Sequence, residues 1–319
     1  MKLKFKYNGV NNLKQDVNKK EKMYIIGGFL IDDNSYTFAN YFDYFNDETS
    51  TYSYDFAPIV TSSGAAIGIK NEFWSIVGQD GNDTLTSRGY FTNVDNSTPN
   101  HNKVIMFKNN SWATKPNFTY TMRGNRGCAV DDYGFSIGGS DGSPHNYNIK
   151  INIINDTYIN KSGFPNSTEG TESNSLSENE FHSIGGTSER VCKLYSLLND
   201  IWTTKTNINH DKKYQAQMKL NNKIYASGGN SVNSDKYNDE YDPINNVWTN
   251  KVNFSSYGPR LSASSQAKNK GFVFQGVNLE STARSKRTYK YNPDTNNWVQ
   301  EIDYLNSRYT NTGSSIFDI

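Results

Sequence analysis

Residues on which many protein classes depend are scarce in this sequence. Its 319 residues include two cysteines, too few for a disulfide-stabilised scaffold. A run of about 18 apolar residues, which a membrane-spanning helix needs, is absent. Residues 1–11 are basic but lack the apolar stretch of a signal peptide. We therefore expect a cytoplasmic protein with no membrane partner.

Net charge and histidine are scarce as well. The 33 basic and 32 acidic residues leave a formal net charge of +1, so no global field attracts nucleic acid and we expect no such partner. The histidines are His101, His145, His182 and His210. They fall at different positions of the repeat described next, so the sequence predicts no metal site. Phosphate-binding loops, zinc-binding cysteine clusters and nucleophile elbows are also missing, and neither a cofactor nor an enzymatic activity is predicted.

Aromatic residues, by contrast, make up 14% of the chain, and many belong to an internal repeat. Short apolar runs end at a glycine mark, and most marks lie roughly 43 to 50 residues apart, the period of propeller repeats. These marks stand near residues 28, 78, 139, 186, 229 and 276. A second marker is an apolar residue seven positions before an aromatic one, in the pairs Phe45/Tyr52, Ile105/Trp112, Ile151/Tyr158, Tyr195/Trp202, Tyr241/Trp248 and Tyr291/Trp298. We expect each pair to face each other across a hairpin, because turn-forming residues separate its members.

The repeat predicts an all-β chain. Strands at short, regular spacing without helical periodicity indicate a sandwich, barrel or propeller, and the period favours a β-propeller with four antiparallel strands per blade. Six units predict six blades, formed by residues 23–319 as a single domain. We expect residues 312–319 to add the innermost strand of the first blade beside residues 23–28, because an open ring leaves unpaired edges. Residues 1–22 are left over, either as an outer strand or as an arm that grips a partner.

The combination of an apolar run, a Gly-Gly doublet, and a tyrosine and tryptophan separated by six residues resembles the kelch repeat. The resemblance covers residues 23–319 and is strongest in the last two units, whereas Tyr52 and Tyr158 replace tryptophan earlier. It implies a six-bladed kelch-type β-propeller closed by the C-terminal strand, with the glycines and aromatics as scaffold residues. Copper radical oxidases and iron-dependent specifier proteins share this fold, but the chain lacks their ligand sets.

A basic residue recurs about fifteen positions before the glycine mark, where a loop enters the innermost strand. The series comprises Arg123, Lys213, Arg260 and, for the shared blade, Arg308. Ser62 and Gly170 interrupt it. The resemblance implies that this edge surrounds the channel mouth, where arginines pair with the acidic side chains of a partner. The alternative is that these side chains are solvated and bind loop carbonyls.

Two long segments are expected on the same face, because loops of more than about 12–15 residues are usually functional or disordered. The segment 79–103 contains Arg88 and Tyr90, which we add to the candidate binding residues. The segment 161–180 is rich in serine and glutamate and precedes an innermost strand.

The two cysteines are predicted to be free. Cys128 falls on the innermost strand of the third unit and Cys192 on the third strand of the fourth. Their Cα atoms should therefore lie beyond the roughly 7 Å limit for a disulfide.

Three functions remain open. The leading hypothesis is a non-enzymatic interaction scaffold that binds a protein or an acidic peptide on the channel face. The second is a structural component of a larger assembly, such as a phage virion or tail. The third, which the small number of histidines disfavours, is a carbohydrate-active or metal-dependent enzyme of the kelch type.

Overall fold

The computed structural model describes most of the chain from residue 21 onward. The described ranges are 21–26, 29–32, 35–38, 41–46, 51–56, 65–69, 72–79, 100–108, 111–188, 190–229, 235–255, 258–277, 284–303, 308–309 and 312–317. Residues 1–20 of the predicted N-terminal arm, as well as Ser62, Arg88 and Tyr90, lie outside them, whereas residues 21 and 22 of that arm belong to a strand.

The described residues form six four-stranded antiparallel sheets and one three-stranded sheet. Sheet 1 contains β27 (Thr312–Phe317), β1 (Glu21–Ile26), β4 (Tyr41–Asn46) and β5 (Thr51–Phe56). Sheet 2 contains β6 (Ala65–Ile69), β7 (Glu72–Gln79), β8 (Asn100–Lys108) and β9 (Ser111–Lys115). Sheet 3 contains β10 (Arg126–Val130), β11 (Tyr133–Ile137), β12 (Asn148–Asn152) and β13 (Thr157–Asn160).

The second half of the chain repeats this order. Sheet 4 contains β14 (Thr171–Ser177), β15 (Glu180–Gly185), β16 (Cys192–Ser196) and β17 (Ile201–Thr204). Sheet 5 contains β18 (Ala216–Leu220), β19 (Lys223–Ser227), β20 (Asn238–Asp242) and β21 (Val247–Asn250). Sheet 6 contains β22 (Ala263–Ala267), β23 (Lys270–Val277), β24 (Arg284–Asn292) and β25 (Asn297–Gln300).

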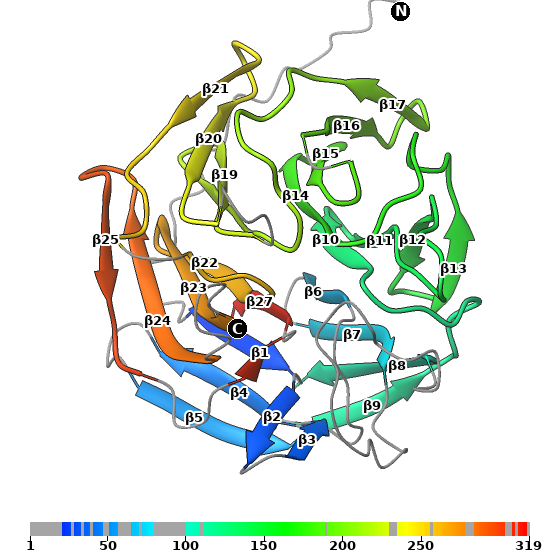
Figure 1. The fold of residues 1–319 in the computed structure, drawn as a ribbon. Helices are drawn as coiled ribbons and strands as arrows, with labels where there is room; N and C mark the ends of the chain where they lie inside the picture. Colours follow the sequence, from blue (N-terminus) through cyan, green and yellow to red (C-terminus); the bar gives the residue numbers. More distant parts are fainter. Residues whose placement is uncertain are drawn as a thin grey trace, which may run out of the picture.

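The four-stranded sheets surround a common axis, each with its first named strand innermost (Figure 1). Each inner strand contacts the inner strand of the next sheet, and β22 contacts β27, so the ring is closed. β27 pairs with β1 with Ser315 opposite Met23. The predictions of an all-β propeller and of a C-terminal strand in the first sheet are both confirmed.

The antiparallel order sends the connections to two faces. The turns between first and second strands, and between third and fourth strands, emerge on one face, which we call the turn face. The other face, which we call the loop face, carries the connections from second to third strands and the linkers between sheets. Its described segments include 116–125, 138–147, 161–170, 205–215 and 251–255.

The Gly-Gly doublets of sheets 3, 4 and 5 each contact the linker to the next sheet on the loop face. The first glycines, Gly138, Gly185 and Gly228, have φ of 65°, 73° and 69°. A Cβ atom on each would lie 2.5, 2.3 and 2.2 Å from a backbone oxygen of the following linker, in Thr168, Lys212 and Pro259 respectively. The second glycines donate their N–H groups to the same three carbonyls, at 2.9, 2.9 and 3.2 Å. Only glycine combines this backbone conformation with so close an approach.

The predicted aromatic pairs face each other in five of the six units, as Tyr195 faces Trp202. The pair in the second unit is wrong: Trp112 faces Phe107, and Ile105 faces Thr114. The connection there, between β8 and β9, has two residues, whereas the other five hairpins have four. The shorter turn changes which residues are opposite.

These aromatic residues also bind the linker of the preceding sheet. Trp202, Trp248 and Trp298 each donate the indole N–H to a linker carbonyl, at 2.8, 2.9 and 3.1 Å. Tyr158, which stands where later units have tryptophan, donates its hydroxyl to the carbonyl of Pro116 at 2.6 Å. The tyrosine substitution therefore preserves the contact.

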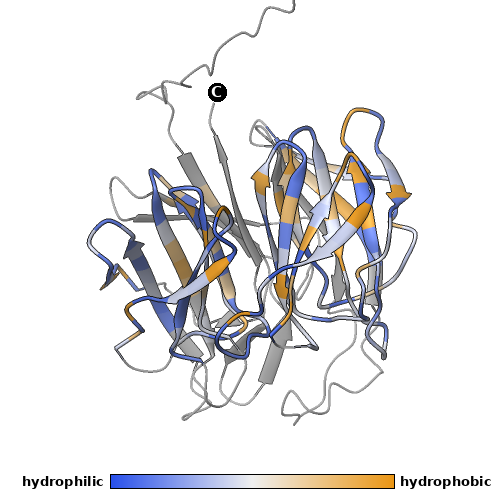
Figure 2. Cartoon of the chain, turned by 90° about the horizontal axis from the view of Figure 1, so that it is seen from above, coloured by the Kyte–Doolittle hydropathy of each residue, from blue (hydrophilic) through white to orange (hydrophobic). Residues whose placement is uncertain are grey.

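The apolar core lies between sheets. Among the described residues, five hydrophobic clusters each contain side chains from two neighbouring sheets. Along the strands, apolar and polar residues are interspersed (Figure 2). Cys128 on β10 and Cys192 on β16 are buried and free, as predicted.

Two features differ from the prediction. Much of the segment 161–180 is not loop, because its residues Thr171–Ser177 form the inner strand β14. Its buried hydroxyls have partners within the sheet, because Thr171 and Ser173 both bond the hydroxyl of Ser183, at 2.8 and 3.1 Å. The three-stranded sheet of β26 (Arg308–Tyr309), β2 (Phe29–Asp32) and β3 (Ser35–Phe38) was not foreseen. No helix long and apolar enough to cross a membrane occurs in the described ranges.

Candidate functional site

An arc of three backbone hydrogen bonds joins the described linkers where they enter the inner strands of sheets 3 to 6. The N–H of Gly170 binds the carbonyl of Gly124 at 2.9 Å, Tyr214 binds Gly170 at 2.8 Å, and Leu261 binds Tyr214 at 3.2 Å. All four residues have positive φ, between 54° and 70°. They are therefore equivalent positions in sheets 3 to 6, and we call them the mouth ring.

The residue before each mouth-ring position is Arg123, Glu169, Lys213 or Arg260. Three of the four predicted basic residues thus occupy equivalent places on one face. The position in sheet 4 belongs to Glu169 and not to Gly170, which is itself a mouth-ring residue. Counting back from the glycine mark misplaces it by one residue, because β14 contains a β-bulge between Ser175 and Ser177.

Arg308, the fourth predicted residue, lies in a different local structure. It belongs to β26 and pairs with Leu30 of β2 in the three-stranded sheet. The structure therefore does not place it in the ring of equivalent positions that Arg123, Lys213 and Arg260 share.

Glu169 brings a carboxylate among the basic residues. Its side chain lies over Gly124, where a Cβ atom would be 2.5 Å from the Glu169 Cγ. Its Oε2 lies 3.8 Å from Lys213 Nζ. Burial raises the pKa of Tyr214 well above its usual value, and the charge of Glu169 raises it further, whereas Arg123 acts in the opposite direction. The carboxylate of Glu169 therefore already lies next to the mouth ring, close to Lys213.

Arg123 is held by its backbone and not by an ion pair. Its N–H and carbonyl exchange hydrogen bonds with Ser140 at 2.9 and 2.8 Å. Its side chain is half-buried, and within the described part of the chain its guanidinium forms no salt bridge. Arg260 is also half-buried; burial lowers the pKa of its guanidinium, and Asp235 partly opposes this effect.

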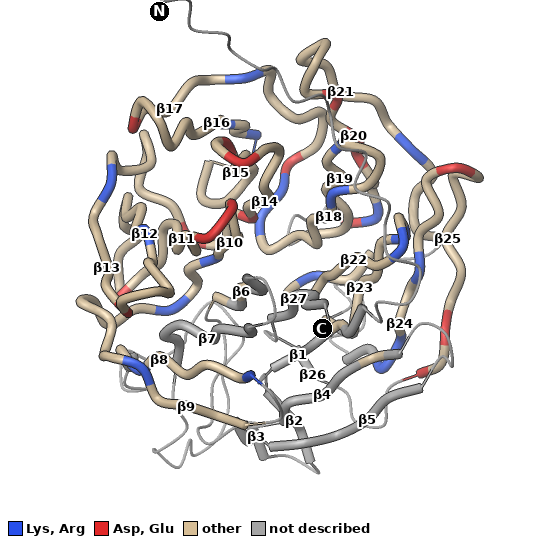
Figure 3. The backbone as a smooth tube through the Cα atoms, turned by 180° about the vertical axis from the view of Figure 1, so that it is seen from behind, with Lys and Arg blue, Asp and Glu red and all other residues tan. Residues whose placement is uncertain are grey.

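A buried ion pair lies next to the mouth ring, at the start of two inner strands. Arg126 Nε binds Glu172 Oε1 at 2.5 Å, and the guanidinium carbon of Arg126 lies 5.4 Å from the centre of the Tyr214 ring. Burial raises the pKa of Glu172 to about 7, although Arg126 favours the charged form. Among the residues that Figure 3 colours by charge, acidic and basic ones are interspersed, so any attraction for anions there is local.

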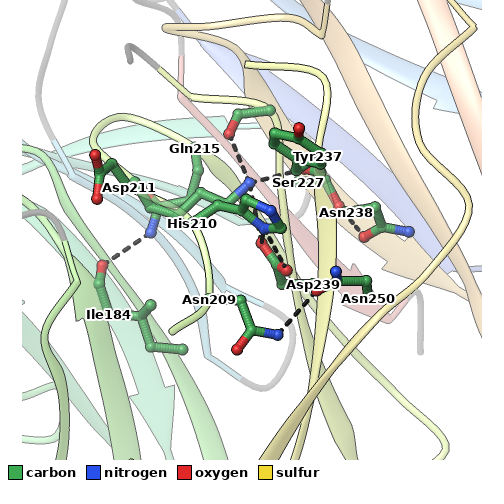
Figure 4. Close-up of polar contacts among 12 residues, drawn as sticks. Ile184, Asn209, His210, Asp211, Gln215, Ser227, Tyr237, Asn238, Asp239 and Asn250 are labelled. Carbon is green, nitrogen blue, oxygen red and sulfur yellow. Dashed lines mark hydrogen bonds and ion pairs between the residues drawn. The ribbon is translucent and has the colours of Figure 1, made fainter. Parts of the chain in front are cut away.

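A second polar cluster lies in sheet 5 and was missed by sequence reasoning (Figure 4). Asp239 is fully buried, with Oδ1 2.9 Å from His210 Nδ1 and Oδ2 3.4 Å from Lys212 Nζ. Lys212 also binds the carbonyls of Gly228 and Tyr237 at 3.1 and 2.7 Å. Burial lowers the pKa of Lys212 to about 8, against the influence of Asp239. A comparison of the repeats with one another could have found this cluster, because other repeats have uncharged residues at some of these positions.

The remaining described histidines are separate from one another. His182 is buried on β15, where desolvation lowers its pKa to about 3. His145 on the loop face binds Asp141 at 2.7 Å. In the described ranges no group of three or more metal-binding side chains is found.

Comparisons with known proteins support the fold. No protein-family model and no curated protein matches the chain. A solved structure described as "Structure of YjhT" is similar with a TM-score of 0.65 at 10% sequence identity, over 88% of this chain and 97% of that one. At this identity the likeness shows a shared β-propeller fold and nothing about activity.

Proposed function

We propose that this chain is a six-bladed kelch-type β-propeller that acts as a non-enzymatic binding scaffold. Its partner is a protein or an acidic peptide that docks on the loop face around the mouth ring. The six four-stranded sheets and the glycine and aromatic contacts between them support the kelch assignment.

The binding proposal rests on one observation. Each of three basic residues directly precedes a mouth-ring residue, and the carboxylate of Glu169 lies among them. These residues are Arg123, Lys213 and Arg260. Arginine and lysine at a partly desolvated rim bind carboxylates strongly, and arginine does so with two parallel hydrogen bonds. Glu169 shows that a carboxylate fits this space. A partner's carboxylate would use Arg123, which makes no salt bridge within the described residues.

The test is binding of a fluorescent glutamate-rich decapeptide, measured by fluorescence anisotropy. We expect Arg123→Ala and Lys213→Ala each to weaken binding by roughly 30-fold, equivalent to about 2 kcal/mol. Raising the salt concentration should weaken binding to the unmodified protein as well.

Lys268→Ala is the matched control, since Lys268 is an exposed base in a turn on the opposite face. Its peptide affinity should equal that of the unmodified protein. Equal affinity in all variants, or no binding of the peptide at all, would contradict the proposal and favour a component of a larger assembly.

A further inference from the structure

The polar cluster of sheet 5 fills positions that are uncharged in sheet 3. Lys212 and Met122 each stand two residues before the mouth-ring position of their sheet, and His210 and Tyr120 stand four before it. Asp239 is likewise the second residue of the third strand, as Ile149 is in sheet 3. The trio of lysine, aspartate and histidine thus replaces methionine, isoleucine and tyrosine.

In sheet 3 this set packs as ordinary core. Met122 and Ile149 belong to the cluster between sheets 2 and 3, and Tyr120 stacks on Tyr147 with ring centroids 4.1 Å apart and an interplanar angle of 17°. The propeller therefore does not require charge at these positions.

In sheet 5 the charged set is buried in the same place. Lys212 and Asp239 are both 0% exposed, and His210 stacks on Tyr237 with centroids 3.7 Å apart at 9°. Removing two charges from water costs free energy that a hydrophobic set avoids. Sheet 3 packs without charge at these positions, and the charged set is expected to be less stable than its apolar counterpart, so a role outside folding accounts for it better.

The cluster holds the His210 ring so that Nδ1 faces Asp239 and Nε2 points away from it. Asp239 accepts the Nδ1 proton at 2.9 Å, and three acceptors surround the Lys212 amine. A carboxylate behind Nδ1 keeps the proton there and turns the lone pair of Nε2 away from it. The His210 side chain is 20% exposed, and none of the described residues binds its Nε2.

The charged groups around His210 occur in opposite pairs. Lys212 balances Asp239, Arg190 forms an ion pair with Asp211 at 2.5 Å, and Lys236, 5.8 Å from the centre of the Tyr237 ring, interacts with Asp235. Asn209 donates to the side-chain oxygen of Asn250 at 2.8 Å, and both amides are exposed beside the histidine (Figure 4). Nε2 of His210 is thus a hydrogen-bond acceptor beside the uncharged amides of Asn209 and Asn250. Such a site binds an uncharged hydroxyl group better than an anion.

We propose that His210, supported by Asp239 and Lys212, is a second binding site on the loop face. It takes a neutral ligand that donates a hydroxyl hydrogen bond to Nε2. This site is separate from the mouth ring and does not depend on the binding of an acidic peptide there.

The test uses the full chain with isotope-labelled histidine and a panel of neutral polyols and monosaccharides, followed by NMR. We expect saturable shifts of the His210 ring signals, while those of His145 and His182 stay unchanged. The His210→Tyr variant reproduces the Tyr120–Tyr147 stack of sheet 3. It should stay folded with a lower melting temperature, because Asp239 loses one hydrogen-bond partner, and bind the same compound at least tenfold more weakly in calorimetry.

A triple variant, His210→Tyr with Lys212→Met and Asp239→Ile, transplants the whole set of sheet 3. It should fold with a melting temperature at or above that of the unmodified protein and lose ligand binding. A clearly lower melting temperature would show that the charged trio serves the fold and would overturn the proposal. Shifts at His210 with acetate or phosphate but with no polyol would overturn it too, as would an unresponsive His210.

Discussion

Glu172 is largely buried and contacts Arg126 directly. Its protonation should therefore change the stability of the folded protein with pH. Burial raises its pKa from the ordinary value of 4.5 to about 7. Between these two values the folded state binds a proton that the unfolded state releases. The contribution of this residue to stability is thus greatest below pH 4.5 and is lost as the pH rises toward 7.

We expect the stability of the unmodified protein relative to Glu172→Gln to fall between pH 4.5 and pH 7, by up to about 3 kcal/mol. Urea unfolding of both proteins at pH 4.5, 5.5 and 7 measures this difference. Glu178→Gln, an exposed residue in the β14–β15 turn, should show no such trend. A difference that is flat or grows with pH would mean that Arg126 keeps Glu172 charged throughout.

Gly228 lies where sheet 5 contacts the linker that leads to sheet 6. It has a φ of 69°, and a Cβ atom there would lie 2.2 Å from the carbonyl oxygen of Pro259. We expect Gly228→Ala to lower the free energy of unfolding by about 2 kcal/mol or more, because it adds a steric overlap to a strained backbone.

Gly142 offers a control for this substitution, as it also has positive φ, 130°, but is exposed. Gly142→Ala reports the cost of a side chain at a positive φ without the overlap, and chemical denaturation measures the loss in both variants. Because alanine is less tolerated at a φ of 130° than near 69°, a clearly smaller loss in Gly228→Ala than in Gly142→Ala would show that the contact with Pro259 contributes little.

Among the elements, β27 connects the C-terminal part of the chain to sheet 1. It occupies the inner position of sheet 1, pairs with β1 and contacts both β22 and β6. Deleting residues 312–319 should expose the inner edge of sheet 1 and remove several kcal/mol, enough to unfold a marginally stable domain.

Thermal denaturation of the truncated protein measures this loss. A synthetic peptide of residues 312–319 should restore the melting temperature in a concentration-dependent manner, whereas a scrambled peptide should not. An unchanged melting temperature after truncation would contradict the role of β27 in closure.

For the molecule as a whole, the sequence predicted the elements better than the sites. Glycine marks and facing aromatics recur because every sheet meets its neighbour through the same contacts, as with Gly185 against Lys212 and Trp248 against Thr206. Periodic contacts leave a periodic signal. The residues that broke the period, such as the bulge in β14 and the short turn after β8, shifted single positions without disturbing the architecture.

The candidate sites were harder to predict because they are exceptions to the repeat. Glu169 was hidden by a one-residue offset, and its contact with Lys213 spans 44 positions of sequence. His210 and Asp239 lie 29 residues apart, and neither belongs to a recurring motif. Only the three-dimensional equivalence of sheets 3 and 5 reveals that charge has replaced apolar packing.

The pairing of β1 with β27 has a consequence for synthesis on the ribosome. About 290 residues separate the two strands, and at about 5–20 residues per second the partner of β1 appears roughly 15 to 60 seconds after it. During that interval β1 leaves the ribosome with its inner edge unpaired. Chaperones that cover exposed strands should therefore engage this nascent chain early and release it only when β27 has emerged.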